Sequence, residues 1–311
     1  MNADREQFRW PTLKHVSGSQ VRMVCDSVSP QGIRLSTMEV KMPRFILAEV
    51  NTHRQLSRNS ASSRAIPVAK MLKTVHEEPF LFETFFRNQK GMAVSEPLPA
   101  DVQEEAQKIW LETRDLVIGQ VEKLLQLDVS KGQANRLLEP FMFQTALITA
   151  TDWSNMIALR AHQDAQPEFQ HVAEMMRDIL KMVEPQQLKY GEWHLPLVHP
   201  WEFDEFSLEE LRFISAGRCA RVSYVTHGGE RDPQADITLA HNLVSGGHMS
   251  PLEHQARPLS DEDLELPWLA YKDPKEPQIQ ETRCGNFLGW FQFRRMIPNE
   301  ADFSLSLPDQ L

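Results

Sequence analysis

Alternating apolar and polar positions in the first part of the chain predict β-structure. The stretches VRMVCDSVS, residues 21–29, and IRLSTMEVKM, residues 33–42, show this alternation and flank the turn-forming residues PQG. Two such stretches joined by a short turn indicate a β-hairpin. The next stretch, RFILAEV, leads directly into the polar segment NTHRQLSRNSASSRAIP, residues 51–67.

Helical periodicity replaces this alternation in the middle of the chain. Between residues 101 and 127 the apolar residues recur with the spacing of one helix face; they are Val102, Ala106, Ile109, Leu116, Val121 and Leu124. The mostly apolar run 134–150 predicts a core helix that Pro140 bends or divides. Further helices are predicted from Pro167, which suits a first helical turn, and after Ser207, which forms a capping box with Glu210.

The composition is that of a globular protein and excludes several classes of function. Of the 311 residues, 41% are hydrophobic and 24% are charged, and the net charge is −10. This charge argues against nucleic-acid binding, which depends on neutralising phosphates. No stretch reaches the roughly 18 apolar residues of a membrane helix, so no membrane partner is predicted. The three cysteines are widely spaced, which fits a reducing compartment, and we expect a cytoplasmic protein.

The polar segment 51–67 is the first candidate for chemistry. It follows a predicted strand and contains three Arg among several Ser. Guanidinium groups and hydroxyls are suitable ligands for a phosphate group. A solvated Ser-rich loop is the alternative, and composition alone leaves both interpretations open.

Two further Arg residues lie in mainly apolar stretches. Arg136 belongs to NRLLEPF and Arg160 to IALRAHQDAQPE. An Arg on an apolar helix needs either a carboxylate partner or an anionic ligand. A structural salt bridge is therefore the alternative to an anion site for each of them.

The histidines of GGHMSPLEH, residues 246–254, do not have the spacing of a zinc signature. No metal site is predicted. GxGxxG, P-loop, HExxH and GxSxG motifs are also absent from the sequence. Catalysis would therefore depend on a bound cofactor that the protein positions.

The motif THRQLSRNSASSRA resembles the signature of the flavin-dependent thymidylate synthases. That signature reads Arg-His-Arg, two residues, Ser, one residue, Asn-Glu, one residue, Ser, one residue, Arg; the matching positions here are His53, Arg54, Ser57, Asn59, Ser62 and Arg64. Residues 135–141 resemble the family's Arg-containing helix, and residues 154–170 resemble its flavin- and pyrimidine-binding helix. Residues 219–254 resemble the family's N-terminal segment but follow the signature here, as in a circular permutation or in the rearranged long chains of some bacteriophages.

The resemblance implies a role for each matched residue. The catalytic residues would be His53, Asn155 and Arg160, with Arg160 on the pyrimidine ring. The flavin ligands would be His53, Arg54, Asn59, Asn155, His248, Ser250, Glu253 and Arg294. The substrate ligands would be Glu49, Ser62, Arg64, Arg136 and Arg160.

Three positions depart from the family pattern. Thr52 stands in place of the first Arg, Ser60 in place of the Glu, and Glu49 in place of the preceding Gln. We hypothesise that residues 289–296, GWFQFRRM, form a second copy of the signature strand. Arg294 and Arg295 would then replace the missing cation.

The resemblance implies C5 methylation of dUMP to dTMP, with FAD as cofactor, NADPH as reductant and methylenetetrahydrofolate as carbon donor. It also implies that no cysteine acts as a nucleophile. The departures leave two alternatives open. One is a related enzyme that forms a hydroxymethyl product or takes dCMP, and the other is a non-catalytic nucleotide- or flavin-binding homologue.

The expected architecture is an α+β fold, a mainly antiparallel sheet with a layer of helices. Residues 1–205 would hold the signature and the helical layer, and residues 206–311 would complete the same compact catalytic unit. We expect a homo-oligomer, either a tetramer or a dimer. If a phage encodes the chain, its location would be the host cytoplasm.

Overall fold

The computed structural model describes residues 10–62, 64, 66–91, 94–222, 232–266, 279–298 and 300. Its centre is a mainly antiparallel six-stranded sheet with the order β1-β2-β3-β5-β4, in which β6 lies parallel to β2. These strands are β1 (Thr12–Lys14), β2 (Gln20–Val28), β3 (Arg34–Pro43), β4 (Ser57–Ser60), β5 (Phe143–Ala150) and β6 (Gln186–Gln187). The predicted α+β class is confirmed.

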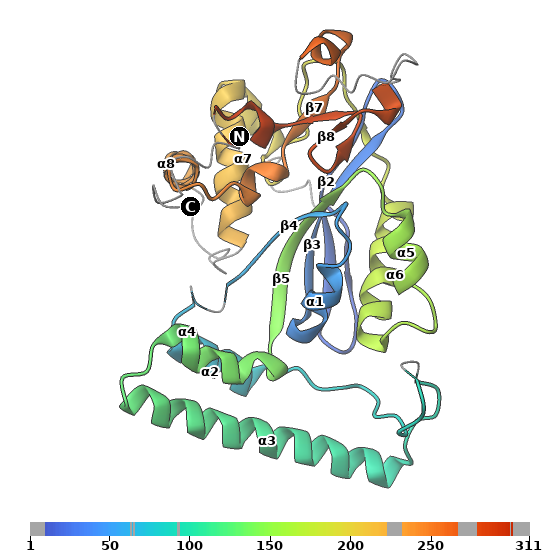
Figure 1. The fold of residues 1–311 in the computed structure, drawn as a ribbon, viewed down its shortest axis with the longest axis vertical. Helices are drawn as coiled ribbons and strands as arrows, with labels where there is room; N and C mark the ends of the chain where they lie inside the picture. The colour runs from blue at the N-terminus through green and yellow to red at the C-terminus, as the bar shows by residue number, and fades with distance from the viewer. Residues whose placement is uncertain are drawn as a thin grey trace, which may run out of the picture.

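The helices are α1 (Leu47–Val50), α2 (Val68–Glu77), α3 (Ala100–Gln126), α4 (Lys131–Ala134), α5 (Ser154–Arg160), α6 (Pro167–Met182), α7 (Leu208–Val222) and α8 (Pro233–Ser245). Four short strands lie near the C-terminus: β7 (Ala256–Pro258), β8 (Arg283–Cys284), β9 (Phe287–Leu288) and β10 (Trp290–Gln292). Figure 1 shows the large sheet between α5 and α6 on one side and α7 on the other.

The predicted hairpin is confirmed as β2 and β3, whose register runs from Gln20 opposite Lys41 to Val28 opposite Arg34. Gly32 in the connecting turn has a φ of 80°, a conformation that favours glycine. Residues 44–50 do not continue the strand, because Arg44–Ile46 form the 3₁₀ helix η2 and α1 follows. The signature segment therefore begins after a helical turn.

The prediction of a core helix over residues 134–150 is wrong. Residues Asn135–Phe141 form the 3₁₀ helix η3, which contains Pro140, and Phe143–Ala150 form the strand β5. Proline removes a donor from the helical hydrogen-bond pattern, and the β-branched and aromatic residues that follow favour a strand. β5 lies inside the sheet, between β3 and the edge strand β4.

The sheet is covered on both faces, which explains why β5 is apolar almost throughout. Alternate residues such as Ile148 pack with Phe169 and Met176 of α6 in the largest core. The intervening residue Leu147 packs with Cys219 of α7 on the opposite face. A strand buried on both sides reads as a continuous apolar run, which periodicity alone does not distinguish from a buried helix.

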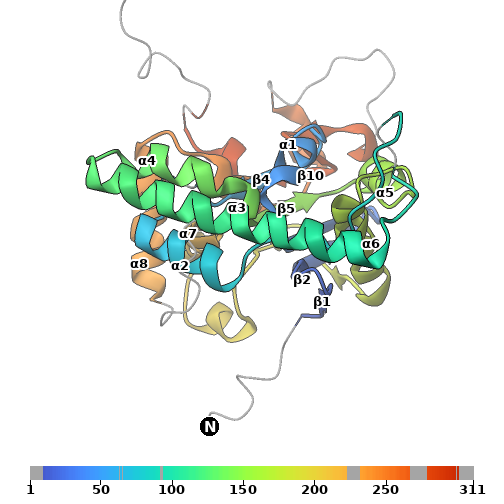
Figure 2. The same cartoon turned by 90° about the horizontal axis from the view of Figure 1, so that it is seen from below.

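The predicted helix over residues 101–127 is confirmed as α3. It packs with α2 and η3 in a second core, and Figure 2 shows it crossing the lower end of the molecule. Trp110 of α3 meets Phe82 and Phe141 edge-to-face, with ring centroids 5.0 and 5.1 Å away. No helix in the described part of the chain has the length and apolar character needed to cross a membrane.

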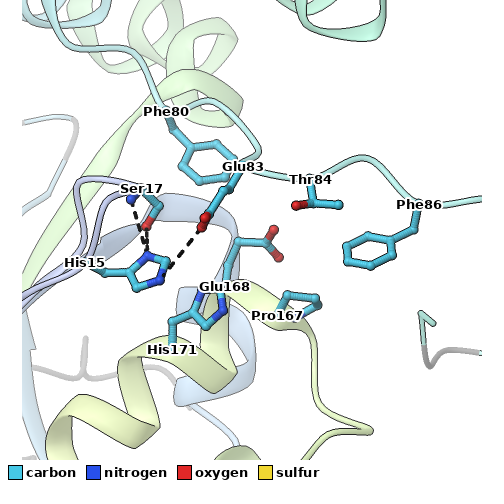
Figure 3. Close-up of a pocket in the computed structure, with 9 residues that line it drawn as sticks. All are labelled: His15, Ser17, Phe80, Glu83, Thr84, Phe86, Pro167, Glu168 and His171. Atoms are coloured by element: carbon cyan, nitrogen blue, oxygen red, sulfur yellow. Dashed lines mark hydrogen bonds and ion pairs between the residues drawn. The ribbon is translucent and has the colours of Figure 1, made fainter. Parts of the chain in front are cut away.

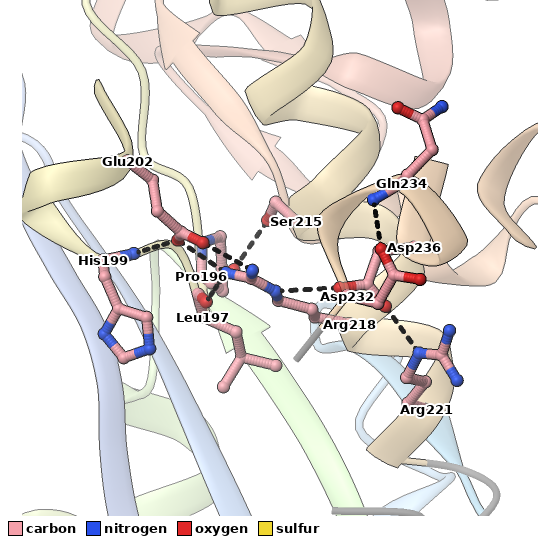
Figure 4. A network of polar contacts seen from close by, with 10 residues as sticks. All are labelled: Pro196, Leu197, His199, Glu202, Ser215, Arg218, Arg221, Asp232, Gln234 and Asp236. Atoms are coloured by element: carbon pink, nitrogen blue, oxygen red, sulfur yellow. Dashed lines mark hydrogen bonds and ion pairs between the residues drawn. The ribbon is translucent and has the colours of Figure 1, made fainter. Parts of the chain in front are cut away.

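A buried ion network joins α7 to its neighbours (Figure 4). Arg218 donates two 2.6 Å hydrogen bonds to Glu202 of the 3₁₀ helix η4 (Pro200–Asp204) and one 3.0 Å bond to Asp236 of α8. Burial opposes ionisation of Glu202, but the bonds from Arg218 hold the pKa of its carboxyl below the usual value. The network fixes α7 where its last turns cover the sheet.

Candidate functional site

Four of the predicted site residues converge beside the start of β4. Arg160, at the end of α5, donates a hydrogen bond from Nε to Nε2 of His53 at 3.1 Å. Its Nη1 forms an ion pair with Glu49 of α1, and Asn155 of α5 hydrogen-bonds the side chain of His53. We call Glu49, His53, Asn155 and Arg160, together with Phe169, the His53 cluster.

The His53 cluster combines a cation with a neutral imidazole. Burial lowers the pKa of His53, and the charges of Arg160 and Arg58 lower it further. Because Nε2 accepts a bond from Arg160, the proton of the neutral ring resides on Nδ1. The guanidinium of Arg160 lies over the ring of Phe169, with Cζ 5.0 Å from the centroid, a favourable cation–π arrangement.

Two residues at this site were not predicted from the sequence. Phe169 directly follows AQPE within the matched residues 154–170, but an aromatic residue on a helix usually signals only a core position. Arg58 occupies a variable position of the signature, and its Nη1 donates to the carbonyl oxygens of His53 and Leu56 at 2.7 and 3.0 Å. Arg58 thereby holds the turn that presents His53.

The signature residues on β4 itself are engaged by the C-terminal part of the chain. Ser57 accepts hydrogen bonds from Asn286 at 3.1 Å and from Gln292 at 3.2 Å. Asn59 is buried and donates to the backbone carbonyl of Cys219 at 2.8 Å. Both side chains therefore help to join the signature strand to α7 and the C-terminal strands.

The predicted phosphate ligands Ser62, Arg64 and Arg136 lie near the other end of β4. Arg64 is exposed and its side chain passes so close to Gly132 that a Cβ there would lie 3.3 Å from Arg64 Cγ. Gly132 precedes Arg136 by one helical turn. We call Ser62, Arg64 and Arg136 the Arg64 group.

Arg136, which the sequence places in a mainly apolar stretch, does not lie on a buried helix face. Its side chain is 52% exposed and donates a 2.7 Å hydrogen bond to Glu139. Arg160 is also paired, through Glu49. The cost of an unpaired interior Arg therefore gives no argument for a ligand at either position.

The remaining predicted flavin ligands lie along or beyond the 3₁₀ helix η5 (Ser250–Glu253). Glu253 accepts a 2.5 Å hydrogen bond from Arg294, which also pairs with Glu300 at 2.9 Å. His248 and Ser250 are exposed, as is Arg54 of the signature. Their roles as ligands stay predictions.

The C-terminal segment does not form a second copy of the signature strand. β10 pairs with β7 in a separate two-stranded sheet, and residues Phe293–Met296 form the 3₁₀ helix η8. Arg294 and Arg295 both contact Glu300. Because both already have a carboxylate partner, the hypothesis that they replace the cation missing at position 52 is weakened. The hydroxyl of Thr52 itself donates a 2.6 Å hydrogen bond to the carbonyl oxygen of Glu49.

The cysteines are unsuited to nucleophilic chemistry, and the two histidines of residues 246–254 do not form a cluster with a third ligand among the described residues. Burial raises the pKa of the thiols of Cys25 to about 12 and of Cys284 to about 11, and it raises that of Cys219 as well. His254 is fully buried with Nδ1 2.8 Å from the hydroxyl of Thr149, and burial lowers its pKa to about 3. His248, by contrast, is exposed and is not buried beside His254.

Comparison with known proteins places the signature within a recognised family. The model of the family described as "Thymidylate synthase complementing protein" matches residues 29–186. This range contains the signature and the blocks around Arg136 and Arg160, but not the predicted permuted segment, so the permutation stays a prediction. No curated protein matches the chain.

Among solved structures, two crystal structures of the UMP/dUMP methylase PolB from Streptomyces cacaoi are similar. The complex with 5-Br UMP has a TM-score of 0.45 at 15% identity and covers 55% of this chain and 92% of its own. The complex with 5-Br dUMP has a TM-score of 0.44 at 13% identity and covers 55% and 93%. Since the family model spans half of the chain and contains its signature, this protein belongs to the thymidylate synthase complementing protein family.

Proposed function

We propose that this protein methylates dUMP at C5 to form dTMP, with FAD as cofactor, NADPH as reductant and methylenetetrahydrofolate as carbon donor. The observation that supports this most is the hydrogen bond from Arg160 to His53. It joins two blocks that are separated by about a hundred residues and that both fall within the family match.

The chemistry of the His53 cluster fits a flavin and a pyrimidine. Arg160 and the amide NH2 of Asn155 supply donors for the electron-rich polar edge of a reduced flavin or for a pyrimidine carbonyl, while the Nδ1 proton of His53 is held by Asn155. When bound, the flavin would supply the hydride that reduces the transferred carbon. Arg160 would stabilise negative charge on the carbonyl side of the pyrimidine, which makes C5 nucleophilic enough to attack the transferred carbon.

Glu49 would orient Arg160 and complete base recognition. The Glu49–Arg160 ion pair places a carboxylate acceptor beside guanidinium donors, and the guanidinium packs on the ring of Phe169. Uracil offers an N3–H donor next to a carbonyl acceptor, which this pair can match. Because a carboxylate repels phosphate, we assign Glu49 to the base rather than to the phosphate group.

The phosphate ligands in this proposal are Ser62, Arg64 and Arg136. Ser62 lies five residues beyond Ser57, about 16 Å along an extended strand, whereas His53 lies before Ser57. α4 precedes β5 and α5 follows it, so the Arg64 group and the His53 cluster approach the sheet from different ends (Figure 1). We propose that each site combines the Arg64 group of one copy with the His53 cluster of another, in a homo-oligomer.

Two alternatives compete with this proposal. A carboxylate at position 49 can also accept from the exocyclic amino group of cytosine, which favours dCMP as a second candidate substrate. The non-catalytic alternative is supported by Thr52 and by the carboxylate partners of Arg136 and Arg160.

The test is turnover by the FAD-loaded protein with dUMP, methylenetetrahydrofolate and NADPH, with products identified by mass spectrometry. We expect dTMP, and we expect Arg160→Lys to lower kcat/KM by about a hundredfold. Arg212→Lys is the matched control, because Arg212 also stacks on aromatic rings but lies outside the cluster. A hydroxymethyl product, or turnover of dCMP alone, would select the first alternative, and no turnover with bound flavin would select the second.

A further inference from the structure

A second cluster of metal-ligating side chains lies outside the residues used above. His15 is in the turn between β1 and β2, Glu83 is in the segment after α2, and His171 is on α6. One potential ligand atom from each lies within 4.8 Å of the other two, and these are the one such group among the described residues. Figure 3 shows the three side chains directed toward one another.

The cluster lines a real cavity. The pocket has a volume of about 180 Å³ and is also lined by Ser17, Phe80 and Glu168. Figure 3 shows Glu168 in the same pocket with its carboxylate directed away from the imidazole of His15. The pocket has room for a water molecule, which could be a further ligand.

The geometry is close to that of a metal centre. The two imidazole rings stack with centroids 4.0 Å apart, and Nε2 of His15 lies 3.7 Å from a carboxylate oxygen of Glu83. Ligands about 2.0–2.2 Å from a tetrahedral ion lie roughly 3.3–3.6 Å from one another. The His15–Glu83 distance is close to this range, but the three ligand atoms together lie within 4.8 Å of one another, so the side chains must close around an ion. Glu83, whose side chain is 48% exposed, has freedom to move.

The hydrogen bonds around His15 leave one nitrogen directed into the cluster. Its Nδ1 lies 2.9 Å from the hydroxyl of Ser17 and accepts a 3.3 Å hydrogen bond from the backbone N–H of Ser17, while Nε2 faces Glu83. Binding of an ion by Nε2 would place the ring proton on Nδ1, where it can donate to the Ser17 hydroxyl. A partner on the second ring nitrogen is the usual way in which proteins orient a metal-binding histidine. Two imidazoles and a carboxylate suit a borderline divalent transition ion rather than Ca²⁺ or Mg²⁺.

We infer that His15, Glu83 and His171 form a binding site for a divalent transition-metal ion, with Zn²⁺ as the best match to the donor set. The site goes beyond the proposed catalytic function. It would join the β1–β2 turn and the segment after α2 to the first turns of α6. Phe169, which supports Arg160, lies in those same turns, so the ion would stabilise the helix that underlies the His53 cluster.

The experiment adds Zn²⁺ alone, without flavin or nucleotide, to the metal-free full chain and measures heat of binding and Tm. We expect stoichiometric binding and a higher Tm, and we expect His171→Ala and Glu83→Gln each to weaken binding about tenfold or more. Co²⁺ should give the intense visible absorption of a four-coordinate site in the wild-type protein and lose it in both variants. Glu83→Gln is included because its exposed side chain can change without disturbing the fold.

His162→Ala is the matched control, since His162 is an exposed histidine 3.5 Å from a carboxylate oxygen of Asp164. It should bind Zn²⁺ like the wild type. Equal binding by the wild type, His171→Ala and Glu83→Gln would overturn the inference, as would a wild-type protein whose Tm does not respond to Zn²⁺. In that case His15 and Glu83 would form only an ion pair. Because no nucleotide is present, this result does not depend on the proposed enzymatic function.

Discussion

At the scale of single residues, Arg160 joins the main elements of the proposed chemistry. It donates to His53, pairs with Glu49 and lies on Phe169. The sequence predicted the first two of these residues through motif resemblance. It did not predict their mutual contacts, because the ion pair bridges more than a hundred positions that no local pattern connects.

Burial of the cysteines gives a prediction at this scale. The raised pKa values of Cys25, Cys219 and Cys284 keep the thiols protonated at neutral pH, and thiols are weak nucleophiles in that form. Changing each in turn to Ala should leave turnover within about twofold, with a stability loss of about 1 kcal/mol for the fully buried Cys219. Steady-state kinetics on the folded variants measures this, and complete loss of activity in one of them would refute a cysteine-independent mechanism.

At the scale of elements, local signals predicted helices better than central strands. The capping box of Ser207 and Glu210 is present, with Ser207 Oγ accepting from the backbone of Glu210 at 3.3 Å, and Pro167 does begin α6. β5 was mistaken for a helix because both of its faces are covered, by α6 and by α7. That coverage depends on helices that begin 17 and 58 residues after β5 ends, which a short window of sequence does not contain.

The close contact between α7 and α8 gives a prediction about packing. A Cβ at Gly217 would lie 2.2 Å from the backbone oxygen of Asp236, so the helices would have to separate. Gly217→Ala should destabilise the protein by about 2 kcal/mol. Gly119→Ala on α3 is the control, because a Cβ there meets no atom within 4 Å and alanine favours the helix by up to about 1 kcal/mol. Urea unfolding measures the free energy of unfolding of both variants. Equal changes in this free energy for Gly217→Ala and Gly119→Ala would contradict the prediction.

The network around Arg218 predicts how stability responds to acid. The folded-state pKa of Glu202 lies below its ordinary value of 4.5. Its contribution is therefore fully present above that value and is lost as the pH falls through the folded-state pKa. Glu202→Gln should cost about 3 kcal/mol at pH 7, because it leaves Arg218 without its main partner. The difference in free energy of unfolding between Glu202→Gln and the wild type should shrink as the pH is lowered. A difference that stays the same from neutral to acidic pH would contradict a contribution from the ionised Glu202 carboxylate.

At the scale of the whole molecule, the division of the site residues into two groups is the feature that matters most. Sequence resemblance gave roles to the residues of both groups, except Phe169, without dividing them between copies of the chain, and the fold places the two groups toward different ends of β4. No residue-level pattern reveals this, because it depends on the order of β4, β5 and the helices around them.

A shared site predicts complementation between inactive variants. Arg64→Ala and Arg160→Ala should each lose most activity when prepared alone. When the two chains are co-expressed, some sites would pair an intact Arg64 with an intact Arg160 from another copy, so activity should recover well above that of either variant. Co-expression of two Arg160→Ala chains with different tags is the control. Lack of recovery in mixed oligomers of confirmed composition would indicate that each chain holds a complete site.

The most direct test of the account is the absorption spectrum of the purified protein, loaded with FAD and titrated with dUMP and then with dCMP. The account predicts a bound flavin whose visible band shifts with dUMP, a shift that Arg160→Lys abolishes and Arg212→Lys retains. A shift of the flavin band with dCMP alone would indicate a cytosine nucleotide as the substrate and would still support the flavin site. A protein that binds no FAD, or whose flavin spectrum is indifferent to both nucleotides, would contradict the proposed function.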